Sequence, residues 1–250
     1  MHSKTRILAA ALASVALLSG CPADDSSSSV PGPQSEFLAA PPQFPADPSQ
    51  FVEEIDNPYL GFARGRVFTY EELADEGGET IVVEVTNDTK TILGVATTVV
   101  HDQVFVDGDL IEDTFDWYAQ DVDGNVWYFG EDSKEMENGE VVSTEGSWEA
   151  GVNGAMPGIA MLAKPKLGQK YQQEFAVGVA EDMAQIKSLK TEVEVPFGSF
   201  DGCLETKEWT PLHPGGSERK IYAPGVGLVL ELSSKGLGHQ RRTELVSIEE

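Results

Sequence analysis

The sequence has very little cysteine: Cys21 and Cys203 are the only two in 250 residues. Cys21 lies three residues beyond an apolar N-terminal run and, as argued below, is expected to be modified, so Cys203 has no partner left and we expect no intramolecular disulfide. Cys203 enters an apparent strand and has no neighbouring base in the sequence that could activate it. We therefore interpret Cys203 as a buried, inert thiol.

Familiar catalytic motifs are also missing. The histidines beyond the N-terminal run are His101, His213 and His239, each isolated and none in the HExxH spacing of a zinc protease. The sequence contains no GxSxG elbow and no glycine loop of the kind that cradles phosphate. These absences argue against metalloprotease, α/β-hydrolase and P-loop chemistry.

Only one long apolar run is present, residues 7–18, and its 12 residues are too few for a bilayer core that needs about 20. Lys4 and Arg6 precede the run, and its last residue, Leu18, begins the letters LSGC at positions 18–21. This arrangement resembles the signal and lipobox of bacterial lipoproteins. The resemblance implies that residues 1–20 are a signal peptide and that Cys21 carries a diacylglycerol, whose two acyl chains anchor the protein stably in a membrane.

The segment after Cys21 is rich in proline. Residues 22–50 hold seven of the 14 prolines and a run of four serines at 26–29. Such a composition buries little apolar surface, so we predict a tether over residues 21–50 and a single β domain over 51–250. The end of the tether, residues 40–48, could instead pack on the domain, and the sequence leaves both possibilities open.

The charge balance is strongly acidic. Without Lys4 and Arg6, 15 Lys and Arg residues face 42 Asp and Glu residues, a formal charge of −27. Such a surface repels nucleic acid and anionic lipid headgroups, and it favours cations or basic partners. Solubility alone also explains it.

The hydrophobic pattern after residue 58 has a period near two. Ile81, Val83 and Val85 alternate with more polar residues, and paired turn residues recur between such runs. The turn pairs are Gly77-Gly78, Asp107-Gly108, Asp123-Gly124, Asn138-Gly139 and Gly215-Gly216. The sequence therefore predicts an all-β fold, a single antiparallel meander curled into a barrel or half-barrel. Only residues 155–163 suggest a short helix or an apolar loop.

Aromatic residues are densest around the turn at Asp123-Gly124. On one hypothesis, Trp117, Trp127 and Phe129 line a cavity for an apolar or sugar ligand, and Asp116 and Gln120 supply polar contacts. The alternative is that these large side chains form the core by cross-strand packing.

The same turn partly matches a calcium loop. Asp121, Asp123, Asn125 and Asp132 occupy its positions 1, 3, 5 and 12. Position 6 is Val126 rather than glycine, and Asp132 replaces the usual glutamate. A β-hairpin explains the same residues, so a weak calcium site is the lesser alternative and no other cofactor is expected.

The chain also resembles a group of uncharacterised bacterial lipoproteins. The resemblance spans most of residues 56–248 and rests on NPY at 57–59, DWYAQDVDGNVWYFGED at 116–132 and YAPGVGLV at 222–229. The last motif is similar to a closing hairpin of meander lipoproteins, some of which are half-barrel lipid carriers. The resemblance implies this fold and location and carries no established activity.

Together these patterns favour a lipid-anchored protein of the bacterial cell envelope, with its domain in the periplasm or on the cell surface. We expect it to be non-enzymatic, to contact the membrane through the Cys21 lipid, and to bind an apolar or amphipathic ligand, a lipid or a glycan, in a concave β face. Nucleic acid is not an expected partner. One alternative is a carbohydrate-active hydrolase with paired carboxylates, for which Asp113, Asp116, Glu145 and Glu149 are candidates. Another is a structural or calcium-binding surface module.

Overall fold

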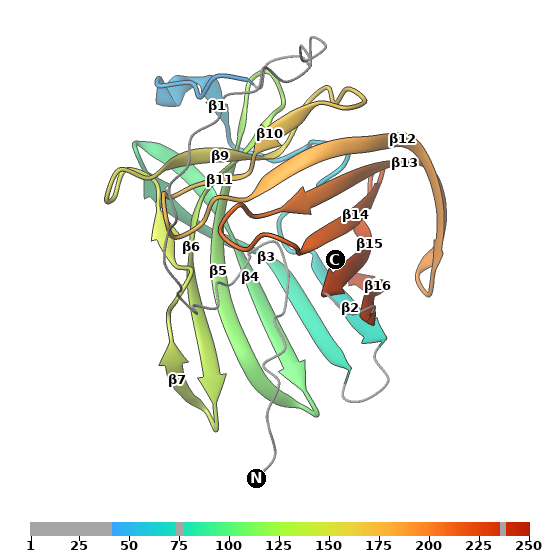
Figure 1. The fold of residues 1–250 in the computed structure, drawn as a ribbon. Coiled ribbons are helices and arrows are strands. Elements are labelled where there is room, and N and C mark those ends of the chain that lie inside the picture. Colours follow the sequence, from blue (N-terminus) through green and yellow to red (C-terminus); the bar gives the residue numbers. More distant parts are fainter. Residues whose placement is uncertain (1–41, 74–77, 236–238) are drawn as a thin grey trace, which may run out of the picture.

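The structure, a computed structural model, describes residues 42–73, 78–235 and 239–250, and the strands there form one antiparallel sheet that curls almost into a barrel (Figure 1). Five consecutive strands build its first half: β2 (Val67–Leu73), β3 (Glu79–Ile92), β4 (Val95–Val106), β5 (Asp109–Asp121) and β6 (Val126–Glu137). Another five build the second half: β12 (Met183–Val195), β13 (Gly198–Trp209), β14 (Ser217–Ala223), β15 (Gly227–Lys235) and β16 (His239–Glu249). Strand β16 pairs with β2 and joins the halves. The predicted antiparallel β meander is confirmed.

Short strands complete the sheet. They are β1 (Phe51–Val52), which follows the 3-10 turn η1 (Pro48–Gln50), and β7 (Glu140–Ser143), β8 (Trp148–Glu149), β9 (Met156–Met161), β10 (Lys170–Gln172) and β11 (Glu174–Phe175). Strand β10 pairs with β12 at one end of the sheet, and β11 pairs with β9 at the other. Residues 170–175 therefore hydrogen-bond to both ends and nearly close the barrel.

The expectation of a short helix or apolar loop at 155–163 is wrong. Residues 156–161 form strand β9, which pairs with β6 so that Ile159 lies opposite Trp127. The edge of β6 supplies the hydrogen-bond partners that favour the extended backbone, and no pattern within the segment itself signals them. The structure describes no α-helix in residues 42–73, 78–235 and 239–250, and hence no helix there long and apolar enough to cross a membrane.

Two predicted hairpin turns have the expected backbone. Asp107 and Gly108 have φ angles of 54° and 86°, and Asn138 and Gly139 have 53° and 81°. Positive φ at both central positions defines the type I′ turn that suits the strand twist. An unpredicted turn of the same kind, at Leu93-Gly94, separates β3 from β4. Gly77 lies outside the described residues.

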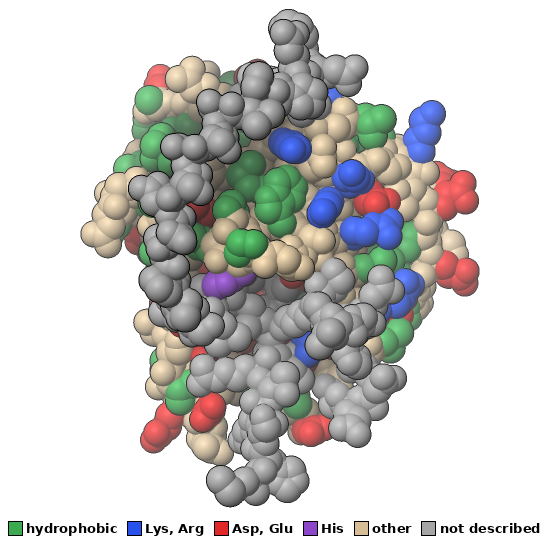
Figure 2. All heavy atoms as spheres, viewed as in Figure 1, with side chains coloured by type: hydrophobic (Ala, Val, Ile, Leu, Met, Phe, Trp, Pro, Cys, Tyr) green, Lys and Arg blue, Asp and Glu red, His purple; other side chains and the backbone are tan. Residues whose placement is uncertain are grey.

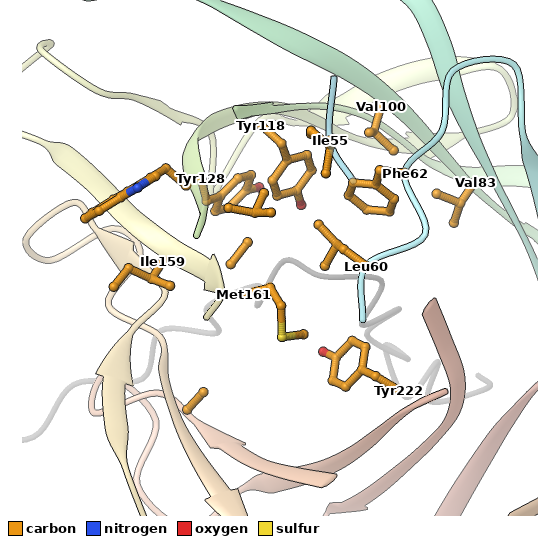
Figure 3. Packing of buried hydrophobic residues seen from close by; sticks show 14 of the residues in the cluster. Ile55, Leu60, Phe62, Val83, Val100, Tyr118, Tyr128, Ile159, Met161 and Tyr222 are labelled. Carbon is orange, nitrogen blue, oxygen red and sulfur yellow. The ribbon is translucent and has the colours of Figure 1, made fainter. Parts of the chain in front are cut away.

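The connection between β1 and β2, residues 53–66, runs across one end of the barrel, and we call it the strap. Its side chains Ile55, Leu60 and Phe62 are buried and point into the interior (Figure 3). Gly61 has a φ of 67°, and a Cβ there would collide with the carbonyl oxygen of Val226. Only glycine allows the strap to lie this close to the turn between β14 and β15.

Residues 42–50 precede β1, and Phe44 among them packs on the outer face of the sheet. The Phe44 ring lies 5.2 Å from the ring of Trp127 and 5.8 Å from that of Phe129, centroid to centroid. The end of the segment expected to be a tether thus belongs to the packed domain. The signal peptide, Cys21 and residues 22–41 lie outside the residues that the structure describes.

Candidate functional site

The candidate site is the interior of the barrel, which we call the chamber. Successive side chains of a strand point to opposite faces, so paired residues on β4 and β5 enter the chamber together. Val100 lies opposite Asp116, and Asp102 lies opposite Thr114. The inward-facing positions of these strands therefore carry carboxyl groups as well as apolar side chains.

Three carboxyl groups from neighbouring strands lie together on one wall. Asp102, Asp116 and Glu131 are each at most 2% exposed, and Asp116 lies directly opposite Glu131. The Tyr128 hydroxyl donates a 2.5 Å hydrogen bond to Asp116 Oδ1. Within the described residues, Asp116 Oδ2, Glu131 Oε2 and both Asp102 oxygens have no hydrogen-bond partner. Buried carboxyl oxygens without partners are costly, so this wall is open to an added donor.

Strand β14 contributes a buried cation, Lys220, to the chamber. Its Nζ lies 3.1 Å from a Glu208 oxygen, 3.6 Å from one of Glu218 and 3.9 Å from one of Glu231. Thr206 and Tyr222 also donate hydrogen bonds to Glu208. Lys220 is therefore shared among three carboxyl groups.

Burial shifts the protonation of these groups. It raises the pKa of Asp116 to about 7 and, together with the charge on Asp116, that of Glu112 to about 8. Burial and the neighbouring Asp116 and Glu112 also hold the pKa of Asp102 well above its ordinary value. For Lys220, burial lowers the pKa, but Glu208, Glu231 and Glu218 outweigh it and hold the pKa well above 10.5. At neutral pH the chamber therefore stores protons on its carboxyl groups.

An apolar cavity of about 30 Å³ lies between the strap and these carboxyl groups, enough for one or two water molecules. Leu60 and Phe62 of the strap and Phe68 of β2 form part of its apolar lining. Asp102 and Glu231 are the two carboxyl groups in its lining. The cavity thus combines an apolar lining with carboxyl groups, as a site for an amphipathic molecule would.

The predicted ligand-binding residues divide between the two faces of the sheet. Asp116 and Gln120 face inward, whereas Trp117, Trp127 and Phe129 alternate with them and face outward. Gln120 holds the strap: its Oε1 accepts hydrogen bonds of 3.0 and 2.9 Å from the backbone amides of Asp56 and Asn57. The structure therefore brings Asp116 and Gln120 to the chamber and keeps the three aromatic residues apart from it.

The outward aromatic side chains have partners of their own. The Lys90 ammonium lies 3.3 Å from the centroid of the Trp117 ring, and the Trp127 Nε1 donates a 2.8 Å hydrogen bond to Asp121. Phe44 and Phe51 of the N-terminal segment cover Phe129. These contacts form an outer aromatic cluster, with Phe44, Phe51, Trp127 and Phe129 as its members.

The four residues of the calcium-loop pattern are not all close together. Asp121 Oδ1 accepts hydrogen bonds from the backbone amides of Asp123 and Asn125, as in a tight hairpin turn. Asp132 lies further along β6, opposite Phe115, and pairs with Lys134 at 2.8 Å. Among the described residues, no group of three or more His, Cys, Asp or Glu side chains is placed to hold a metal ion.

The motifs behind the lipoprotein resemblance meet at the strap. The Asn57 Nδ2 donates hydrogen bonds to the carbonyl oxygens of Gly124, at 2.9 Å, and Leu162. The Pro58 carbonyl accepts a 2.7 Å hydrogen bond from the Gly225 amide. Three sequence-distant motifs thus fix one element, which closes an end of the chamber.

Sequence analysis missed Asp102, Lys220 and Glu231. A signal for Asp102 exists in the sequence: it sits in phase between Val100 and Val104, both fully buried. A carboxyl group in the middle of an apolar strand face indicates a buried acid. No comparable local signal marks Lys220, whose partners come from β13, β14 and β15.

A scan against models of known protein families finds no match, and no curated protein matches the sequence. Two solved structures are similar in fold. One is a Bacteroides fragilis NCTC 9343 protein, provisionally described as exported and having a YmcC-like fold, with a TM-score of 0.47 and 15% identity over 77% of this chain and 99% of its own. The other is a provisionally described lipoprotein of Parabacteroides distasonis ATCC 8503, with a TM-score of 0.44 and 13% identity over 78% of this chain and 100% of its own. At these levels of similarity the two proteins assign no function to this chain.

Proposed function

We propose that the protein is a lipid-anchored component of the bacterial cell envelope whose chamber binds an amphipathic molecule with a positively charged end. The lipobox at Cys21 supports the anchor. One observation carries the ligand: Asp102 lines a mainly apolar cavity, and neither of its oxygens has a hydrogen-bond partner among the described residues.

An ammonium or guanidinium group would supply what this wall lacks. A hydrogen bond to a charged group contributes about 1.5–3 kcal/mol, roughly twice the value for neutral partners. The carboxyl groups that hold protons at neutral pH would release them to the solvent when a cation binds. Binding therefore strengthens as the pH rises.

The apolar part of the ligand would lie where the strap now contributes Leu60 and Phe62. With the strap in this position, the cavity of about 30 Å³ admits nothing larger than one or two water molecules. Ligand entry thus requires the strap to move away from the turns that contain Gly124 and Gly225, to which it is hydrogen-bonded.

The chamber fits binding better than glycoside hydrolysis. Asp116 and Glu131 are paired across β5 and β6, as two catalytic carboxyl groups could be. Both are almost fully buried, and Tyr128 occupies one oxygen of Asp116. A sugar chain could not reach between them without displacing Tyr128.

The test is titration calorimetry with three matched probes: octylamine, octanol and octanoate. The protein is the mature chain with Cys21→Ser, which carries no lipid. We expect octylamine to bind about tenfold more tightly than the other two, because it alone supplies a charged donor. Its affinity should rise between pH 6 and pH 8.5, as Asp116, with a pKa of about 7, and Glu112, with a pKa of about 8, ionise.

Asp102→Asn provides the decisive variant and Asp109→Asn its control. Asp109 begins strand β5 and is exposed, so its substitution should leave the affinity unchanged. Asp102→Asn should remove most of the preference for octylamine over octanol. Equal affinity for all three probes in the parent protein would overturn the proposal.

A further inference from the structure

The basic residues of the chain are unevenly distributed. Eleven of the 15 Lys and Arg residues beyond residue 20 lie in residues 164–242. Residues 150–173 contain no Asp or Glu at all, although the chain has 42 of them. The acidity of the protein therefore does not extend over its whole surface.

The sheet gathers these cations on one outer face. Lys170 lies opposite Gln185, Gln185 opposite Lys207, and Lys207 opposite Arg219, in one row across β10, β12, β13 and β14. Paired residues of a sheet share a face, and the three cations of the row are exposed. Figure 2 shows Lys and Arg side chains gathered over these strands. We call this row, with the loop 164–169, the basic face.

Apolar side chains lie within the basic face. Leu167 is 68% exposed and follows the exposed Lys164 and Lys166 in the loop. A 2.9 Å hydrogen bond from the Gly168 amide to the Ile186 carbonyl fixes the loop on β12. The Lys170 ammonium lies 5.8 Å from the Trp209 ring centroid, beside a shallow groove of about 440 Å³. Lysine stems, a tryptophan and a protruding leucine are the side chains that settle at a membrane interface.

We infer that the basic face docks on the anionic surface of a lipid bilayer. Charge complementarity carries the inference, since the rest of a chain with a net charge of −27 beyond residue 20 would be repelled by such a surface. The acidic composition alone predicts repulsion from anionic headgroups everywhere, and the clustering of the cations overrides it on this face. Docking would orient the domain on the membrane, whether or not the chamber holds a ligand.

Vesicle flotation tests the inference with the unlipidated Cys21→Ser mature chain. The vesicles are phosphatidylcholine alone, or phosphatidylcholine with roughly one-third phosphatidylglycerol. We expect the protein to float only with the anionic vesicles and to be released by about 0.5 M salt, which screens the attraction. Flotation with neither kind of vesicle, or equally with both, would overturn the inference.

Two double variants distinguish the effect of the basic face on vesicle binding from the effect of net charge. Lys170→Gln/Lys207→Gln removes two cations from the row, and Asn87→Asp/Asn138→Asp adds two negative charges at exposed positions on β3 and at the turn after β6. Both lower the net charge by the same amount. Each lysine near an anionic surface changes binding about fivefold, so the lysine pair should lose roughly 25-fold and the asparagine pair much less. Equal losses would show that net charge alone governs binding and would contradict the inference.

Discussion

The two faces of the β5–β6 hairpin share one backbone and differ in chemistry. The outer face carries Trp117, Trp127 and Phe129, which contact Lys90, Asp121 and the N-terminal segment. The inner face carries Asp116 and Glu131, and each has a buried oxygen without a partner among the described residues. The aromatic side chains of the outer face are thus packed and paired, whereas the inner face retains unmet hydrogen-bonding capacity.

This difference separates stability from function within one hairpin. Packed aromatic side chains contribute apolar burial and specific ring contacts. Buried carboxyl groups reduce stability unless a partner compensates them, so they are typical of sites rather than of cores. We therefore expect substitutions on the outer face to destabilise the fold, and substitutions on the inner face to change its response to pH and ligands.

The largest expected effect is that of Trp127→Ala on the outer face. It removes the ring contact with Phe44 and the hydrogen bond to Asp121. A loss of about 3–5 kcal/mol in the free energy of unfolding is expected, measured by urea denaturation. The inner-face counterpart is Tyr118→Phe, which removes a buried hydroxyl that has no hydrogen-bond partner in the part of the chain that the structure describes. It should be neutral or slightly stabilising, and a similar loss for both variants would erase the contrast between the faces.

The second-largest expected effect is a fall in the free energy of unfolding as the pH rises, caused by the buried carboxyl groups of the inner face. Below pH 3.8, Asp116 is protonated in both the folded and the unfolded chain and has no effect. Between pH 3.8 and about 7 the folded chain keeps this proton while the unfolded chain loses it. Stability therefore falls through this window, by up to about 1.4 kcal/mol per pH unit for each such proton. Glu112 extends the same trend from pH 4.5 to about 8.

Two variants test the origin of this slope. Urea denaturation at several pH values should show a flatter dependence for Asp116→Asn/Glu112→Gln than for the parent protein. Trp127→Ala should lower the whole curve and leave its slope unchanged, because the outer cluster holds no group with a raised pKa. If the double variant kept the full dependence of stability on pH, the protons would be held by groups other than Asp116 and Glu112.

Local patterns in the sequence were sufficient for the fold class. The alternation of apolar and polar residues and the turn pairs at Asp107 and Asn138 identify antiparallel hairpins. Both signals depend only on residues within about ten positions of each other, so they can be read from the sequence. Strand β9 was missed because its partners, β6 and β11, are not joined to it by short hairpin turns. The turn at Leu93-Gly94 was missed because leucine rarely adopts positive φ.

The site was predictable only in part, and alternation explains why. It shows that Asp116 and Trp117 point to opposite faces, but it does not show which face is concave. Phe44, which covers the outer face, lies in a segment whose proline content indicates a tether. Lys220 gathers partners from three strands, a juxtaposition that depends on the register of the sheet.

The smallest expected effect concerns the cover of the outer face, through Phe44→Ala. Phe44 is partly buried and packs against Trp127 and Phe129, so its loss should cost about 1 kcal/mol. Trp127 would then be more exposed, and the tryptophan fluorescence should shift to longer wavelength. Phe175→Ala is the matched control, because Phe175 is 39% exposed on β11 and should change stability by less than about 0.5 kcal/mol. If Phe44→Ala and Phe175→Ala changed the free energy of unfolding equally, residues 42–50 would be a tether that does not stabilise the domain. The stability of the outer face would then come from the sheet alone.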